Sequence, residues 1–161
     1  MCIRDRLNYT TVIDYAAANN KELENFYPAF KAVKDYVVQA PEKTTGWYLP
    51  SIGQWYDFTA NLGGLPSWDD AINEGNDLTP NLYRWSNQTE LVSKINAYFE
   101  PLGTGNYDAI PNGSYQKFFS SSTYSDSGIW TWFVGKQANV VQCWHNVRYN
   151  SDSAVRPILA F

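Results

Sequence analysis

The last 44 residues of this chain are rich in aromatic side chains and poor in charged ones, which leaves few possible folds for them. Residues 118–161 hold nine aromatic side chains and only five charged ones. Short runs rich in Trp, Phe, Val and Ile are separated there by Ser, Asn, Asp and Gly, a pattern typical of strands joined by turns. We therefore predict four strands in hairpins, over residues 118–122, 129–134, 139–145 and 154–161.

A first helix is predicted upstream, over residues 27–38, with Pro28 at its first position. The same proline indicates that any helix over residues 23–26 is separate or kinked. The apolar face of the predicted helix consists of Phe30, Val33 and Val37.

A second helix is predicted from Ser51, which forms a capping box with Gln54, to the pair Gly63 and Gly64. Its inward face consists of Ile52, Trp55, Thr59 and Leu62. Residues 66–80 are rich in Asp, Asn and Gly and are interpreted as a surface loop.

A third helix is predicted to begin at Asn87, which has capping-box spacing to Glu90, and to end at Pro101 and Gly103. Its inward face consists of Leu91, Ile95, Tyr98 and Leu102. Helices followed by an antiparallel sheet place the chain in the α+β class.

The overall composition limits the possible partners. The 161 residues, 44% hydrophobic and 17% charged, suit one globular domain. A net charge of -4 with scattered Lys and Arg argues against nucleic acid, and the apolar runs are too short for membrane insertion. Cys2 and Cys143 form neither a disulfide framework nor a C-x-x-C motif.

The first six residues of the chain are predicted to be non-native. Residues 1–6, Met-Cys-Ile-Arg-Asp-Arg, lack the apolar centre of a signal peptide and resemble a translated sequencing adapter. We expect them to be a non-native leader, and residues 7–161 to be a single domain truncated at its N-terminus. A signal or anchor would have been lost with the upstream sequence.

Three segments carry a resemblance to a known family. They are Gly-Trp-Tyr-Leu-Pro-Ser at 46–51 leading into Gln54 and Trp55, Ser-Ser-Ser-Thr-Tyr at 120–124, and Val-Arg-Pro-Ile-Leu-Ala-Phe at 155–161. Over residues 9–161 the chain resembles secreted bacterial C-type-lectin-like domains of the fibrobacter-succinogenes major domain type, found in surface lipoproteins and pilus-tip proteins.

The resemblance implies a C-type-lectin-like fold, in which helices pack on a small twisted antiparallel sheet and long loops bind ligands. It implies an extracellular or cell-surface location and no catalysis. The first and last strands of such folds usually pair, so the clipped start predicts an unpaired edge beside residues 154–161. Trp47, Leu49, Trp55 and Arg156 lie in the matched segments and are interpreted as scaffold, with Arg156 capping carbonyls or pairing with an acid.

A further similarity is to the variable proteins of diversity-generating retroelements, which use this fold and change Asn codons near the C-terminus. Residues 129–150 show an irregular mixture consistent with such changes. Trp130, Trp132 and Trp144 are not reached from an Asn codon by adenine changes and would have to be templated otherwise.

The predicted ligand-binding residues lie near turns among polar neighbours and have the composition of antibody-like binding surfaces. Trp130 and Trp132 share one strand face, Thr131 and Phe133 share the other, and one of the two sets must be core. The predicted surface consists of Tyr124, Trp130, Trp132, Trp144, His145, Asn146, Arg148, Tyr149 and Asn150.

Catalytic and metal sites are not predicted. Formylglycine-generating enzymes of the same superfamily need two reactive cysteines in the C-terminal half, where this chain has only Cys143. His145 is the only histidine, no Gly-x-Ser-x-Gly motif occurs, and the calcium motifs of lectins are missing. The acidic side chains of Asp69, Asp70 and Asp77 are interpreted as solvated, so no cofactor or metal is expected.

Three functions remain open at this point. The favoured one is a recognition domain that binds a surface protein or a glycan. The alternatives are a structural module of a fimbrial or lipoprotein assembly, and an enzyme using Cys143. The ligand and the oligomeric state are not predicted.

Overall fold

The computed structural model describes residues 2–64, 72–73, 83–86, 88–103, 105, 107–112, 115–123, 125, 128–135, 140–147 and 153–159. For residues 2–8, 72–73, 83–86, 135, 140, 142 and 144–147 it describes the backbone alone.

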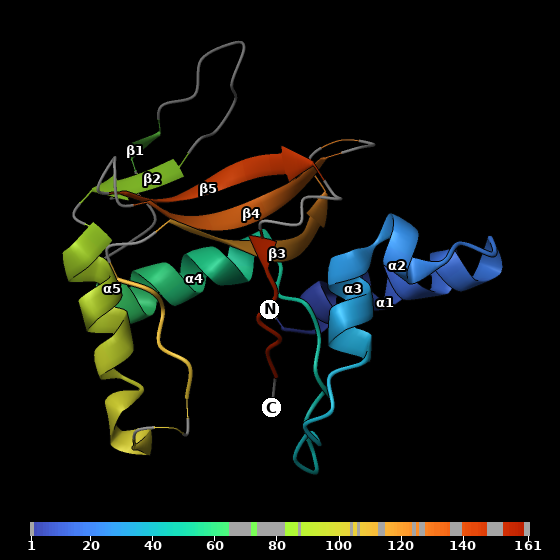
Figure 1. Cartoon of the computed structure of the whole chain (residues 1–161), viewed down its shortest axis with the longest axis horizontal. Coiled ribbons are helices and arrows are strands. Elements are labelled where there is room, and N and C mark those ends of the chain that lie inside the picture. Colours follow the sequence, from blue (N-terminus) through green and yellow to red (C-terminus); the bar gives the residue numbers. More distant parts are fainter. Residues whose placement is uncertain are drawn as a thin grey trace. The chain divides into compact units, whose positions relative to one another are not determined.

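The described residues form an α+β structure with five α-helices and a small sheet (Figure 1), which confirms the predicted class. The helices are α1 (Cys2–Ala18), α2 (Leu23–Phe26), α3 (Pro28–Lys34), α4 (Ile52–Gly63) and α5 (Gln88–Ala97), followed by the 3-10 helix η2 (Glu100–Leu102). The strands are β1 (Ile72–Asn73), β2 (Tyr83–Ser86), β3 (Gln116–Thr123), β4 (Gly128–Gly135), β5 (Val140–Val147) and β6 (Ser153–Ala154).

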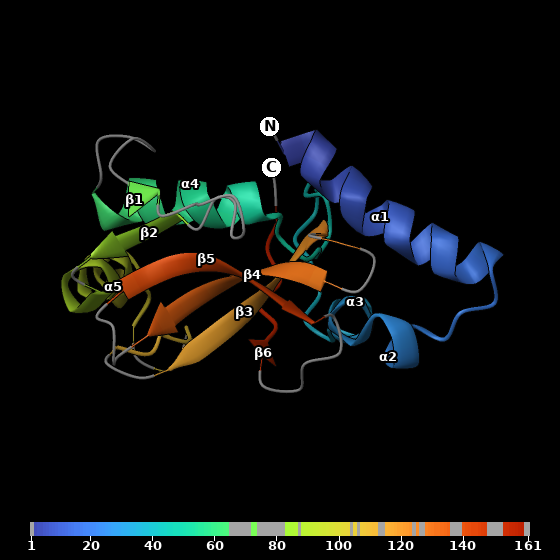
Figure 2. The ribbon, with the colours of Figure 1, turned by 90° about the horizontal axis from the view of Figure 1, so that it is seen from above.

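The strands are ordered β1-β2-β5-β4-β3-β6 in the sheet. The three long strands β5, β4 and β3 lie side by side at its centre, as Figure 2 shows. β2 pairs with β5 in antiparallel register, with Trp85 opposite Val141. The three C-terminal strands predicted over residues 118–145 are therefore confirmed.

Contacts divide the chain into two compact units. Unit 1 comprises residues 1–54, 118–131 and 145–161, and unit 2 comprises residues 55–117 and 132–144.

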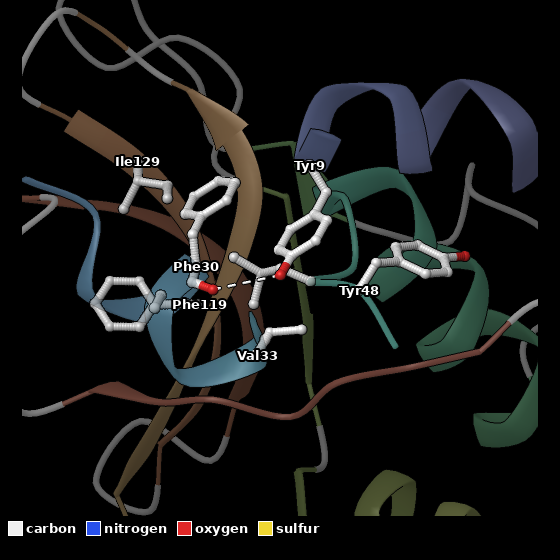
Figure 3. Packing of buried hydrophobic residues seen from close by; sticks show 8 residues of the cluster. Tyr9, Phe30, Val33, Tyr48, Phe119 and Ile129 are labelled. Carbon is white, nitrogen blue, oxygen red and sulfur yellow. Dashed lines mark hydrogen bonds between the residues drawn. The ribbon is translucent and has the colours of Figure 1, made fainter. Parts of the chain in front are cut away.

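The core of unit 1 brings the N-terminal helices onto β3 and β4. Tyr9 stacks on Phe30 with ring centroids 5.5 Å apart, and its hydroxyl donates to the Phe30 carbonyl at 3.4 Å (Figure 3). Tyr48, Phe119 and Ile129 also belong to this buried cluster. Burial raises the pKa of Tyr9 to about 12, with a smaller contribution from the negative charge of Asp35.

The core of unit 2 contains an aromatic cluster between α4 and β4. The rings of Trp55 and Trp132 stack in parallel with centroids 4.8 Å apart. Phe58 meets Trp55 and Trp132 edge-on, at 5.5 Å and 5.8 Å. Offset stacking and edge-to-face contacts are the favoured arrangements of such rings.

The start of α4 matches the predicted capping box. The backbone N–H of Gln54 donates to Ser51 Oγ at 3.2 Å, and the backbone N–H of Ser51 donates to Gln54 Oε1 at 2.9 Å. Each side chain thus satisfies a backbone donor of the helix entrance. The predicted end at Gly63 is also confirmed.

The first predicted helix is shorter than expected. Pro28 separates α2 from α3 as predicted, but α3 ends at Lys34, where the N–H of Asp35 bonds to the Lys31 and Val33 carbonyls. The prediction that Val37 belongs to the helical face is wrong, because its side chain is 93% exposed. A Tyr-Val-Val sequence has low helix propensity, which favours ending the helix before it.

The third predicted helix is also too long at its C-terminus. Leu91 and Ile95 are buried as predicted, but Tyr98 and Leu102 are 60% and 55% exposed. The helical periodicity ends with α5 at Ala97, and the 3-10 turn that follows changes the direction of the next side chains. Asn87, the predicted cap, lies outside the described residues.

Strands β1 and β2 and helix α1 were not anticipated. The predicted loop over residues 66–80 contains β1, which pairs with β2, and the rest of it lies outside the described residues. Helix α1 was also not predicted and begins within the expected leader.

The C-terminal segment is paired at two places, although β6 is the last strand in the order of the sheet. β6 is much shorter than the strand predicted over residues 154–161, and the chain then passes through Pro157, which has no N–H to donate. Beyond the proline, Ile158 forms an antiparallel bridge with Tyr48 through two backbone hydrogen bonds of 3.1 Å and 3.0 Å.

Candidate functional site

The three segments that carry the family resemblance meet in unit 1. Besides the Tyr48–Ile158 bridge, the N–H of Ser121 donates to the Pro50 carbonyl at 2.8 Å. These bonds join residues that are far apart in the sequence: the segment before α4, strand β3 and the C-terminal segment. We call this arrangement the motif junction.

Side chains strengthen the motif junction. The N–H of Ile52, the first residue of α4, donates to Ser122 Oγ at 3.0 Å. Gln54, besides its capping role, donates through Nε2 to the Tyr48 hydroxyl at 2.7 Å. The entrance of α4 is thus fixed both by its own capping box and by strand β3.

The predicted scaffold residues have different roles in the structure. Leu49 and Trp55 are buried in the two cores. Trp47 is partly buried, meets Tyr36 edge-on at 5.1 Å and donates through Nε1 to the Val38 carbonyl at 2.7 Å.

Arg156 lies over an aromatic ring. Its guanidinium carbon is 5.8 Å from the centroid of the Phe118 ring, a cation–π contact that the sequence did not reveal. Packing against the sheet is therefore one of its roles in the scaffold.

The β3–β4 hairpin places one predicted binding residue, Trp130, near a turn. Ser125 and Gly128 exchange backbone hydrogen bonds of 3.2 Å and 3.4 Å across this turn. At the start of β4, Trp130 is partly buried, and its carbonyl accepts a 2.6 Å hydrogen bond from Ser120 Oγ on β3. The backbone that carries Trp130 is thereby held against the neighbouring strand. Tyr124 lies outside the described residues.

Trp132 does not belong to an exposed surface. Its side chain is 0% exposed and is stacked on Trp55 within the core of unit 2. A ligand could reach this ring only if the core rearranged, so we remove Trp132 from the predicted binding surface. The sequence did contain a signal, because an unbroken run of large side chains over residues 129–134 is typical of a strand that is buried on both faces.

The remaining predicted residues follow one another on β5 and beyond it. The backbone of Trp144, His145 and Asn146 belongs to β5, and their side chains lie outside the described part of the structure. Arg148, Tyr149 and Asn150 lie outside the described residues altogether. The structure therefore establishes a strand as the support for Trp144, His145 and Asn146.

Cys143, also on β5, is fully buried. Burial raises the pKa of its thiol far above the ordinary range, and a hydrogen bond with Tyr56 only partly opposes this. A thiol acts as a nucleophile in its ionised form, so this environment suppresses thiol chemistry at Cys143.

In the part of the chain that the structure describes, no cluster of three His, Cys, Asp or Glu side chains forms a potential metal site. None of its helices is long and apolar enough to cross a membrane. Asp69, Asp70 and Asp77 lie outside the described residues.

Comparison with known proteins found no match among family models, among curated proteins or among solved structures.

Proposed function

We propose that this chain is a non-catalytic recognition domain with a C-type-lectin-like fold, which binds a protein or glycan ligand at a cell surface. The observation that best supports this proposal is the motif junction. Three segments chosen for their resemblance to one family are joined by backbone hydrogen bonds of 2.8 to 3.1 Å, although they are far apart in the sequence. A chance resemblance gives no reason for these segments to meet.

The proposed binding residues are the predicted ones without Trp132; among them, Trp130 belongs to β4, and Trp144, His145 and Asn146 belong to β5. The proposed surface consists of Tyr124, Trp130, Trp144, His145, Asn146, Arg148, Tyr149 and Asn150. Rings of Trp and Tyr give large contact area at a small cost in conformational entropy, and Arg and Asn add directional hydrogen bonds. The serine-mediated bond to the Trp130 carbonyl supports a rigid base for such contacts.

Catalysis through the thiol is disfavoured by the buried, proton-retaining state of Cys143. An enzyme of the formylglycine-generating type requires a reactive thiolate, and the core of unit 2 provides the opposite environment. This argues for binding over thiol-dependent turnover.

A screen against glycan arrays and arrays of host and bacterial surface proteins tests the proposal. The purified chain should bind a defined ligand class, and the Trp144→Ala/Tyr149→Ala variant should lose that binding while keeping the far-UV circular dichroism of the parent. The matched control is Tyr15→Ala/Tyr98→Ala, which removes two exposed rings outside the proposed surface. Equal loss of binding in both variants would contradict the proposed location.

Within this proposal, the binding surface is either diversified by a retroelement or fixed. A nucleotide comparison of residues 129–150 with an adjacent template repeat distinguishes the two cases. Differences restricted to adenines would support a diversified protein-binding surface, whereas the absence of such differences would favour a fixed carbohydrate-binding surface.

A second candidate, a structural module of a larger assembly, is supported by one observation. Tyr36, Val37 and Val38 form a consecutive apolar run in which each side chain is exposed, Val37 by 93%. Exposed apolar clusters often form subunit contacts. A stable homo-oligomer in light scattering that dissociates in the Val37→Asp variant would favour this candidate over the first.

A further inference from the structure

A depression of about 350 Å³ lies among the first three helices of unit 1. Its apolar lining comes from Ile13 and Ala17, one turn apart on α1, and from Leu23 at the start of α2. Ile13 and Leu23 also pack against the buried core of unit 1, so contacts with the core hold these two side chains in place. The volume falls at the lower end of the range of about 300 to 1,000 Å³ typical of small-molecule pockets.

Three lysines line the same depression. Lys21 follows α1, whereas Lys31 and Lys34 belong to the last turn of α3. Among the described residues of the lining the one acid is Asp35, which accepts a hydrogen bond from Lys31 and raises the pKa of that lysine; Glu24, outside the lining, raises it further. Three ammonium groups against one carboxylate leave a net charge of +2 on the lining, in a chain whose net charge is -4.

The position of Lys21 is fixed by the end of α1. Asn20 adopts a left-handed conformation with φ 51°, and the N–H of Lys21 donates a hydrogen bond to the Ala16 carbonyl at 2.8 Å. This is the geometry of a helix C-terminal motif in which Asn tolerates positive φ. The Lys21 ammonium then lies 4.7 Å from the centroid of the Phe26 ring.

Helix stabilisation alone does not account for this arrangement. Lysines in the last turn of α3 interact favourably with the negative end of the helix dipole, which explains Lys31 and Lys34. It does not explain why Lys21, from a different segment, lines the same depression, or why the lining between the three lysines is apolar.

We propose that this depression binds a small amphipathic organic anion. The apolar body of the ligand packs on Ile13, Ala17 and Leu23, and its anionic head interacts with the ammonium groups of Lys21 and Lys34, while Lys31 remains paired with Asp35. Lysine acts as a flexible point charge, so the site selects negative charge and an apolar body without demanding the planar shape that arginine recognises. The inference uses only residues 13–35 and does not depend on the function proposed above.

The test uses three probes that separate charge from apolar body: hexanesulfonate has both, hexanol lacks the charge, and methanesulfonate lacks most of the apolar body. Titrations of the full chain are followed by amide chemical shifts in NMR spectra. We expect hexanesulfonate to shift resonances within residues 13–35 saturably, and the other two probes to bind at least about 3-fold more weakly.

The variant Lys21→Gln/Lys34→Gln removes two charges while keeping side-chain length and should weaken hexanesulfonate binding about 3- to 10-fold. The control Lys43→Gln/Lys117→Gln changes the net charge equally at two lysines outside the depression and should retain parental affinity. Equal affinity for hexanol, no saturable shift in this region, or equal weakening by both variants would overturn the proposal.

Discussion

The three consecutive serines of β3 provide a sharp test of the motif junction, because the structure gives each hydroxyl a different environment. Ser120 Oγ donates to the Trp130 carbonyl at 2.6 Å and also accepts from the N–H of Ser122 at 3.2 Å. Ser122 Oγ accepts from the N–H of Ile52 at 3.0 Å. Ser121 Oγ is buried and has no hydrogen-bond partner among the described residues.

The expected energies follow from these contacts. Ser120→Ala removes two hydrogen bonds in a buried position and should cost about 1 to 3 kcal/mol of unfolding free energy. Ser122→Ala removes the acceptor for the first N–H of α4 and should cost about 0.5 to 1.5 kcal/mol. Ser121→Ala removes a buried hydroxyl that gains no bond, so it should be neutral or stabilise the fold by up to about 1 kcal/mol.

Urea unfolding followed by tryptophan fluorescence measures all three variants against the parent. Because each change is the same Ser→Ala substitution on one strand, differences in strand propensity largely cancel between them. The slope with urea should stay constant, so that shifts in midpoint report stability. The reasoning would be refuted if Ser121→Ala destabilised the chain as much as Ser122→Ala.

Three further outcomes follow from the cores. The pKa of Tyr9 is raised to about 12 from the ordinary value of 10, so the stability that its protonated form contributes is complete below pH 10 and is lost as the pH rises to about 12. A pH series of urea midpoints checks this, and the Tyr9→Phe variant should lack the loss. In a Cys2→Ser variant, which leaves Cys143 as the single thiol, Cys143 should react with a thiol reagent only at the rate of unfolding, and rapid labelling of that folded variant would contradict its burial. Gly63→Ala places a Cβ 2.8 Å from Leu91 Cδ2 and should destabilise the fold by about 1 kcal/mol. Gly53→Ala on the same helix meets only Ser51 Oγ at 3.6 Å and should stabilise the fold by up to about 1 kcal/mol. Thermal melts measure both variants.

Elements with strong local signals could be predicted from the sequence. The capping box at Ser51 and the glycines at its other end define α4 through short-range hydrogen bonds and backbone preference. The long strands were predictable because their composition favours sheets whatever their partners are.

Elements that depend on distant partners could not be predicted. β1 and β2 are short, and their pairing with each other and with β5 is a tertiary interaction that leaves little local pattern. Tyr98 continues the helical periodicity in the sequence, but a change of backbone direction after Ala97 exposes it. Periodicity alone does not report where a helix stops.

The candidate binding surface could also be predicted only in part from the sequence. Alternation along β4 correctly required that some of its rings be core, but it could not tell which, because the stack of Trp132 on Trp55 depends on where α4 packs. The lysine-lined depression was not predicted either, since its three cations come from segments that only the packing of the helices brings together.

A binding titration of the array-identified ligand against single alanine variants tests where the chain binds its ligand. Trp130→Ala, Trp144→Ala and Tyr149→Ala probe the proposed surface, and Tyr15→Ala and Tyr98→Ala remove exposed rings elsewhere. We predict that at least one of the first three weakens binding about 30-fold, the effect of a hot-spot residue, and that the other two leave it within about 2-fold. Full affinity in all three surface variants, or the largest loss at Tyr15 or Tyr98, would contradict the account.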